Sequence, residues 1–250
     1  MAEEKQIDIK KAVRQHLEMD MFFTGGFGLK GESDESLQAD SAHEPEAKEA
    51  ASAESGRGLE EIADEVNKCR QCELGGSRKN AVPGEGSPSA RIVFVGEAPG
   101  ADEDVQGKPF VGRAGQLLDK IIIAMGLKRG DVYICNILKC RPPDNRDPKL
   151  TEIISCLPYL QRQLELINPE IIVALGAHAA RTLLETNKSI GQLRGKFHEY
   201  YPSMMTKPIK LMATYHPAYL LRSYSPENRR KVWEDIKKVL TELGMEVPSR

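Results

Sequence analysis

Four cysteines have the spacing of ligands for a metal centre. Cys69 and Cys72 form a Cys-x-x-Cys pair, and Cys140 and Cys156 follow far downstream. Two thiolates on one turn can share a metal, and a second pair brought in by the fold completes four soft ligands. From spacing alone the occupant is zinc or an iron-sulfur cluster, and buried inert thiols are the alternative. Cys135 lies within an apolar run and is expected to be a core residue.

A second set of polar residues follows directly on apolar runs. The run RIVFV is followed by GEAPGADEDVQGKPFVGRAG, residues 96–115, a loop with four carboxylates and Phe110 in its interior. Another run ends at Asn136, and a third is followed by His216. An aromatic face, an amide, an imidazole and a carboxylate together can stack on a planar ligand, hydrogen-bond to it and act on it.

The apolar runs that precede these residues alternate with helical stretches. This order, without a tight Asn-Gly or Asp-Gly hairpin, predicts a single α/β domain with a mostly parallel, four-stranded central sheet flanked by helices on both faces. Ligands of such sheets bind at the carboxyl ends of the strands, so one cleft is expected there. The predicted strands are RIVFVG (91–96), VYICNIL (132–138), EIIVALG (170–176) and IKLMATYHP (209–217).

The distribution of charge divides the chain into three parts. Residues 31–56 hold eight acidic residues against Lys48 alone and no aromatic residue, which predicts an acidic disordered linker. Residues 1–30 are balanced in charge and are expected to form a short amphipathic helix. The net charge of −2 therefore leaves residues 57–250, which hold the predicted α/β domain, at +5. A basic body is compatible with a phosphate-bearing partner.

The remaining composition bears on location and partners. The sequence has no apolar stretch long enough for a membrane span and no signal peptide at its start, so we expect a cytoplasmic protein with reduced thiols. The helix within residues 1–30 ends in an apolar Met-Phe-Phe segment. We expect it to pack on the body or on a second copy, or to contact a repair or replication protein. A monomer is expected.

Taken together, the motifs between Cys69 and Leu243 resemble the family-4 uracil-DNA glycosylases, the iron-sulfur branch of the uracil-DNA glycosylase superfamily. The resemblance rests on several segments in the same order: Cys69-x-x-Cys72, GEAPG and GKPFVGRAGQLLD, NILKCRPPDNRDP, Cys156 and HPAYLLR. It implies a monofunctional glycosylase that acts on uracil-containing DNA, single- or double-stranded, and leaves an abasic site. It also implies that the four-cysteine site holds a structural [4Fe-4S] cluster.

The resemblance assigns roles in the pocket. Phe110 is expected to stack on a flipped uracil, and Asn136 to accept from uracil N3–H and donate to O4, a pattern that cytosine does not offer. Glu103 is expected at the C5 edge, where it would exclude the methyl group of thymine. A solvated surface carboxylate is the alternative for Glu103. The expected uracil-binding set is Ala98, Glu103, Phe110 and Asn136.

Two residues are expected to carry the chemistry. Cleavage of the N-glycosidic bond builds positive charge on the sugar and negative charge on the departing base. His216 is implied as the group that hydrogen-bonds uracil O2 and stabilises the anion, and Glu97 as the group that orients the attacking water.

DNA contacts are expected on two loops. Tyr219, Leu220 or Leu221 would wedge into the space left by the flipped base, and Arg222 would meet a phosphate. These apolar residues equally fit the first turn of a core-facing helix. Arg194 lies between two glycines and is expected near the DNA backbone. His178 and His198 are interpreted as structural or solvated.

A noncatalytic four-cysteine nucleic-acid-binding protein is the alternative function. It would explain the basic body and the metal site, but not a carboxylate, an aromatic ring, an amide and an imidazole gathered at strand ends. A phosphate-binding loop is disfavoured because GEAPG lacks the lysine and the glycine spacing of that motif.

Overall fold

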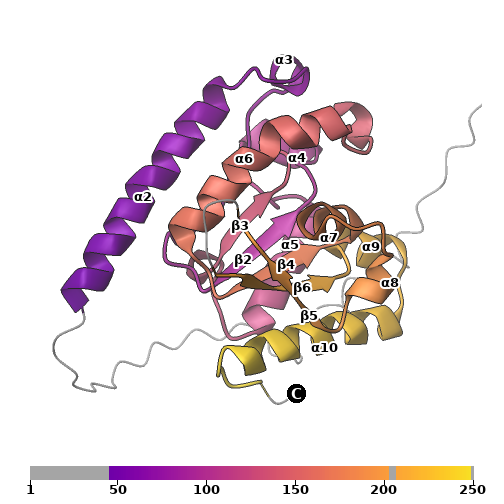
Figure 1. Ribbon diagram of the computed structural model, residues 1–250. Helices are drawn as coiled ribbons and strands as arrows, with labels where there is room; N and C mark the ends of the chain where they lie inside the picture. Colours follow the sequence, from indigo (N-terminus) through magenta and orange to yellow (C-terminus); the bar gives the residue numbers. More distant parts are fainter. Residues whose placement is uncertain (1–44, 203–206, 249–250) are drawn as a thin grey trace, which may run out of the picture.

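Four buried segments form the parallel centre of one sheet, as the sequence predicts. The computed structural model describes residues 45–202 and 207–248, so the predicted helix of residues 1–30 lies outside the described residues. The central strands are β2 (Ile92–Gly96), β3 (Tyr133–Asn136), β4 (Ile171–Leu175) and β6 (Ile209–Thr214). In the sheet they follow the order β3-β2-β4-β6, and all neighbours in this order are parallel (Figure 1).

Two short antiparallel strands extend the sheet at its edges and were not predicted. β1 (Glu85–Gly86) pairs with β3, and β5 (Phe197–Tyr200) pairs with β6. A two-residue strand has no periodicity to detect. β5 is mostly half-exposed or exposed and mixes polar and aromatic residues, so it lacks the continuous apolar run of a central strand.

Helices cover both faces of the sheet, which confirms the predicted α/β class. Along β2, Val93 and Val95 join the core beneath α6 (Leu150–Ile167) and α7 (Ala177–Leu184). Ile92 and Phe94 join the opposite core beneath α5 (Arg113–Ala124) and α10 (Pro226–Glu242). This alternation follows from the two-residue period of a strand, and it explains why the runs read as continuously apolar.

Helix α2 (Pro45–Lys68) runs along the outer side of α6 (Figure 1). Its buried side chains Leu59, Ile62 and Val66 lie on one helical face and join the α6 core. Each such burial contributes roughly 1.5–3 kcal/mol. Ser55 Oγ also donates a hydrogen bond to the carbonyl oxygen of Leu166 at 2.8 Å.

The predicted linker of residues 31–56 overlaps this helix. Residues 45–56 are helical, so the expectation of disorder is corrected for that part. The segment is rich in Ala and Glu, which are strong helix formers, and its low hydrophobicity is offset because the following turns of the same helix pack on α6.

The shorter helices connect these elements, and several of them lie at the carboxyl edge of the sheet. They are α3 (Leu74–Ser77), α4 (Ala101–Gln106), α8 (Ile190–Leu193), α9 (Pro217–Arg222) and the 3-10 turns η1 (Arg129–Asp131) and η2 (Pro143–Asn145). Within the described ranges, no helix has both the length and the apolar character that crossing a membrane requires.

Candidate active site

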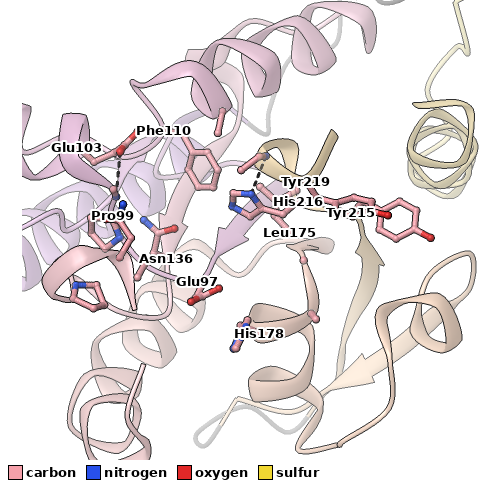
Figure 2. A pocket seen from close by; sticks show the side chains of 18 of the residues that line it. Glu97, Pro99, Glu103, Phe110, Asn136, Leu175, His178, Tyr215, His216 and Tyr219 are labelled. Carbon is pink, nitrogen blue, oxygen red and sulfur yellow. Dashed lines mark hydrogen bonds between the residues drawn. The ribbon is translucent and has the colours of Figure 1, made fainter. Parts of the chain in front are cut away.

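A cavity of about 640 Å³ opens at the carboxyl ends of the four central strands. Residues that follow β2, β3, β4 and β6 line it, as expected for this class of sheet (Figure 2). The structure brings most of the predicted site residues to this one cavity. Its lining includes Glu97, Ala98, Glu103, Phe110, Asn136, His216 and Arg222.

The floor of the cavity depends on a glycine at the end of β2. A Cβ atom at Gly96 would lie 2.3 Å from Asn136 Oδ1 and 2.6 Å from Phe110 Cζ. Phe110 itself has φ +50°, and a Cβ atom at Gly115 would lie 1.9 Å from its carbonyl oxygen. The amide and the aromatic ring can therefore approach each other only because residues 96 and 115 carry no side chain.

Glu103 is bonded to the main chain of its own loop. Its Oε1 accepts hydrogen bonds from the N–H groups of Val111 and Gly112, both at 2.9 Å, and its Oε2 accepts from Gly100 N–H at 3.1 Å. These bonds fix the turn that carries Phe110. The side chain lines the cavity, but its oxygens are engaged in holding the loop.

Asn136 presents a buried acceptor that has no partner within the described part of the chain. The residue is 2% exposed, and its Oδ1 makes no hydrogen bond there. Such an atom is costly to bury without a partner, so Oδ1 is available to accept a hydrogen bond from a molecule in the cavity. The main chain beneath is firmly held, because buried Lys139 donates from Nζ to the Asn136 carbonyl at 2.9 Å and to Gln163 Oε1 at 2.6 Å.

His216 is held as a neutral imidazole. It is the N-cap of α9, and its Nδ1 accepts a hydrogen bond from Ala218 N–H at 3.0 Å. Burial, together with the positive charge of Arg222, lowers the pKa of His216 to about 4. Nδ1 as acceptor assigns the proton to Nε2. The imidazole centroid lies 5.7 Å from that of Phe110.

Glu97 is half-buried directly after β2. Burial is the main cause that raises the pKa of its carboxyl group, and the negative charge of Asp147 acts in the same direction. His178 and Arg222 act in the opposite direction. His178 also lines the cavity, although the sequence indicated only a structural or solvated histidine.

Two tyrosines lie at the cavity; Tyr215 was missed from the sequence, whereas Tyr219 was among the residues expected at the DNA. Tyr215 and Tyr219 both line it, with ring centroids 5.1 Å apart, and Tyr219 is 37% exposed. For Tyr215 the available signal was its position directly before His216 at the end of a predicted strand.

Two of the predicted DNA contacts lie elsewhere. Leu220 is 1% exposed in the core, so the core-facing reading of α9 is the correct one for this residue. The guanidinium of Arg194 binds Asp235 at 2.8 and 3.0 Å, and Asp235 is fully buried. That ion pair leaves Arg194 tied to α10 rather than extended toward DNA. Arg222 is exposed and lines the cavity.

The four predicted metal ligands line a second, small cavity. Cys69 and Cys72 reach it from the chain between α2 and α3, Cys140 from the loop after β3, and Cys156 from α6. No three of these four sulfurs, all in described residues, lie within 4.8 Å of one another. Tetrahedral Zn–S bonds of about 2.3 Å would require sulfurs about 3.8 Å apart.

Polar groups surround the sulfurs as well. Arg78 Nη1 donates to Cys140 Sγ at 2.9 Å, and the N–H of Lys139 donates to Cys156 Sγ at 3.2 Å. Hydrogen bonds of this kind accompany thiolate ligands of metal centres. Cys135 is fully buried in β3, where it was expected in the core.

Comparisons with known proteins point in one direction. Residues 83–237 match the sequence model of the family described as "Uracil DNA glycosylase superfamily", and this range contains every residue named above for the large cavity. A type-4 uracil-DNA glycosylase of Saccharolobus solfataricus is 50% identical over 191 residues, which cover 74% of this chain and 87% of that protein.

Two further relatives carry the same name. The protein of Sulfurisphaera tokodaii is 49% identical over 186 residues, which cover 72% of this chain and 83% of the relative. The protein of Archaeoglobus fulgidus is 45% identical over 195 residues, which cover 76% of this chain and 96% of the relative.

Proposed function

The chain belongs to the type-4 uracil-DNA glycosylases of the uracil DNA glycosylase superfamily, and on that premise we propose how its cavity removes uracil from DNA. The enzyme hydrolyses the N-glycosidic bond of a flipped uracil and leaves an abasic site. One observation carries the assignment of roles: the unpartnered buried Oδ1 of Asn136 faces the same cavity as the neutral imidazole of His216.

Recognition of the base follows from Asn136 and Phe110. Asn136 Oδ1 accepts from uracil N3–H and its Nδ2 donates to O4, while the ring of Phe110 stacks on the base. Cytosine has an acceptor at N3 and a donor at N4. Oδ1 of Asn136 would then face an acceptor and Nδ2 a donor, so neither hydrogen bond could form. Glu103 supports this geometry as a positioning residue, because its carboxylate holds the Phe110 turn. Its role at the C5 edge stays a prediction.

Departure of the base is assisted by His216. The glycosidic bond breaks with its electron pair moving to uracil N1, and the resulting anion carries charge on O2. The Nε2–H of a neutral imidazole donates to O2 and stabilises that charge without transferring a proton. A protonated imidazole would lose the bond that Nδ1 accepts from Ala218.

Attack by water is directed by Glu97. The carboxylate orients a water molecule toward C1′ of the oxocarbenium-like sugar and accepts one of its protons as the new C–O bond forms. Arg222, exposed beside the cavity, contacts a phosphate next to the flipped nucleotide. Of the three candidates Tyr219, Leu220 and Leu221, Tyr219 is the exposed one, and it enters the space left by the base.

The four-cysteine site fits a [4Fe-4S] cluster. Cys69, Cys72, Cys140 and Cys156 would hold it, and three independent features support the fit: four soft ligands, sulfurs spread more widely than a single tetrahedral ion requires, and donors directed at two of the sulfurs. Such a cluster would tie the chain after α2 to α6 and to the segment that carries Asn136, and thus has a structural role.

The cluster is expected to be lost in the Cys72→Ser variant. Iron and acid-labile sulfide should fall to background, and the midpoint of thermal unfolding should drop by several degrees, because a bound cluster stabilises the folded state by its binding free energy. Cys135→Ala is the matched control, since Cys135 is buried outside this site and its replacement should leave the iron content unchanged. Stoichiometric zinc without iron in the wild-type protein would contradict the assignment.

The function itself is tested with an end-labelled oligonucleotide that carries one uracil, beside matched thymine and cytosine controls. Alkali treatment after incubation should break the strand only at uracil. Binding to the same oligonucleotide without strand breakage, by protein with full iron content, would support the noncatalytic nucleic-acid-binding function instead. A monomeric state, a cytoplasmic location with the chromosomal DNA, and contacts of residues 1–30 with a repair or replication protein stay predictions.

A further inference from the structure

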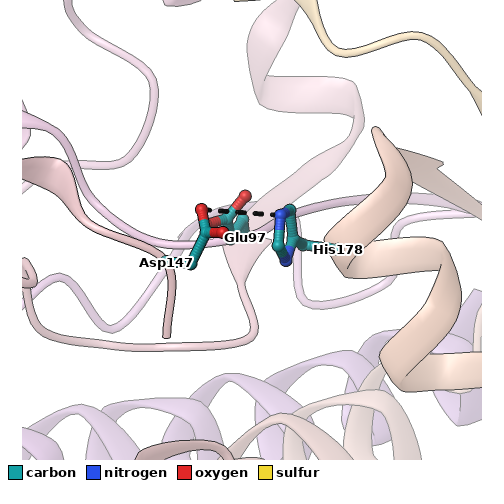
Figure 3. A group of neighbouring side chains, drawn as sticks. All are labelled: Glu97, Asp147 and His178. Atoms are coloured by element: carbon teal, nitrogen blue, oxygen red, sulfur yellow. Dashed lines mark ion pairs between the residues drawn. The ribbon is translucent and has the colours of Figure 1, made fainter. Parts of the chain in front are cut away.

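A polar cluster surrounds the carboxylate that orients the water. Glu97 follows β2, Asp147 lies in the loop before α6, and His178 lies in the first turn of α7, so three separate segments meet here (Figure 3). One nitrogen or oxygen atom of each side chain lies within 4.8 Å of those of the other two. His178 Nε2 is 3.6 Å from Asp147 Oδ1.

The three side chains differ in their access to solvent. Glu97 is half-buried at the cavity, whereas the side chains of His178 and Asp147 are 43% and 82% exposed. His178 touches both regions, because it lines the cavity and also lies beside Asp147. The cluster therefore links the interior carboxylate to bulk water.

The proposed reaction requires a path by which a proton can leave Glu97. Water supplies the oxygen of the new bond to C1′, and one of its protons passes to Glu97. The uracil anion is later neutralised by a proton from solvent, so the sum of the steps is hydrolysis. Glu97 must then lose its proton before it can act again. An imidazole is suited to receive it, since one ring nitrogen can accept a proton while the other releases one.

We propose that His178 and Asp147 are positioning residues that act through Glu97, setting its charge and passing its proton to solvent. This inference deepens the proposed function and depends on it. His178 favours the ionised carboxylate, and Asp147 favours the protonated one. The two neighbours thus have opposite effects on the same group.

The other charged groups near Glu97 leave this arrangement intact. Arg222 of α9 also favours ionised Glu97. Arg146, next to Asp147 in the sequence, binds Glu152 at 2.5 and 2.9 Å, and the oxygens of Glu103 accept from main-chain N–H groups. His216 is neutral above about pH 4. Replacement of His178 or Asp147 therefore tests the influence of this pair on Glu97.

The test compares pH profiles of single-turnover uracil excision. The rate requires ionised Glu97, so it rises with pH through the pKa of that group. His178→Ala removes an interaction that lowers the pKa of Glu97, so the acid limb should move to higher pH and the rate at a fixed pH on that limb should fall. Asp147→Asn removes an interaction that raises this pKa, and the limb should move to lower pH.

If His178 and Asp147 had a purely structural role, their replacement would not move the acid limb in opposite directions. Added imidazole should restore part of the rate of His178→Ala, since the site is open to solvent. His198→Ala is the matched control, because His198 binds the Leu193 carbonyl outside the cavity and its profile should superimpose on that of the wild type.

Two outcomes would overturn the inference. Profiles of His178→Ala and Asp147→Asn that superimpose on the wild-type profile would leave both residues without a role in catalysis. A wild-type rate that depends on added Mg²⁺ or Mn²⁺ would make the cluster a cation site instead. In both cases the wild-type protein still excises uracil, so failure of the inference is distinct from failure of the proposed function, which would appear as no excision at all.

Discussion

The Asn136→Ala variant is expected to excise uracil roughly 10²- to 10⁴-fold more slowly than the wild-type enzyme in single-turnover experiments. The substitution leaves N3–H and O4 of the flipped base without partners in the cavity, and each such group costs about 1–3 kcal/mol. The protein should fold normally, because Asn136 Oδ1 makes no bond within the described structure and Lys139 holds the main chain beneath it.

Asn187→Ala is the matched control, because Asn187 is exposed in the loop after α7 and its loss should change neither rate nor stability. Both variants should keep the iron content and the thermal midpoint of the wild type. Undiminished excision by Asn136→Ala would remove the amide from base recognition and would require another donor and acceptor in the cavity.

Replacement of His216 by alanine is expected to lower the single-turnover rate by about 10²–10³-fold, the usual effect of losing one donor to a developing anion. His216→Ala should still bind uracil-containing DNA, since the stacking ring and the amide remain. An undiminished rate would exclude this residue from the mechanism.

The pH dependence of stability checks the charge state of the same residue. The pKa of His216 is about 4 in the folded protein, against an ordinary value of about 6.5 in an unfolded chain. Between these values the unfolded state binds more protons, so folding stability should fall as the pH drops through this window. Chemical denaturation of wild type and His216→Ala at several pH values measures it, and the variant should lose this part of the dependence.

The sequence predicts the strands that position the site, because each strand has a local sequence signal. Each central strand is a continuous apolar run that ends in a polar or glycine residue, and parallel connections place those ends at one edge. Glu97, Asn136 and His216 are found at the cavity for this reason. Their roles come from the resemblance of the motifs around them, since strand-end position alone would not distinguish a base reader from an ordinary cap.

The features of the site that the sequence did not predict depend on contacts between distant segments. His178 follows Glu97 by a long stretch of sequence, and only the adjacency of β2 and β4 brings the two together. The ion pair of Arg194 was not foreseen because its partner, Asp235, lies on α10. Leu220 was misassigned because a turn as short as α9 does not show by its own periodicity which side faces the core.

The bare α-carbon of Gly96 constrains how this pocket can change over generations. Any side chain at residue 96 would occupy the space of Asn136 Oδ1 and the Phe110 ring, so the effect of a mutation at one of these three positions depends on the residues at the other two. Such dependence is epistasis. A side chain at residue 96 can be accommodated only if residue 136 or residue 110 changes with it.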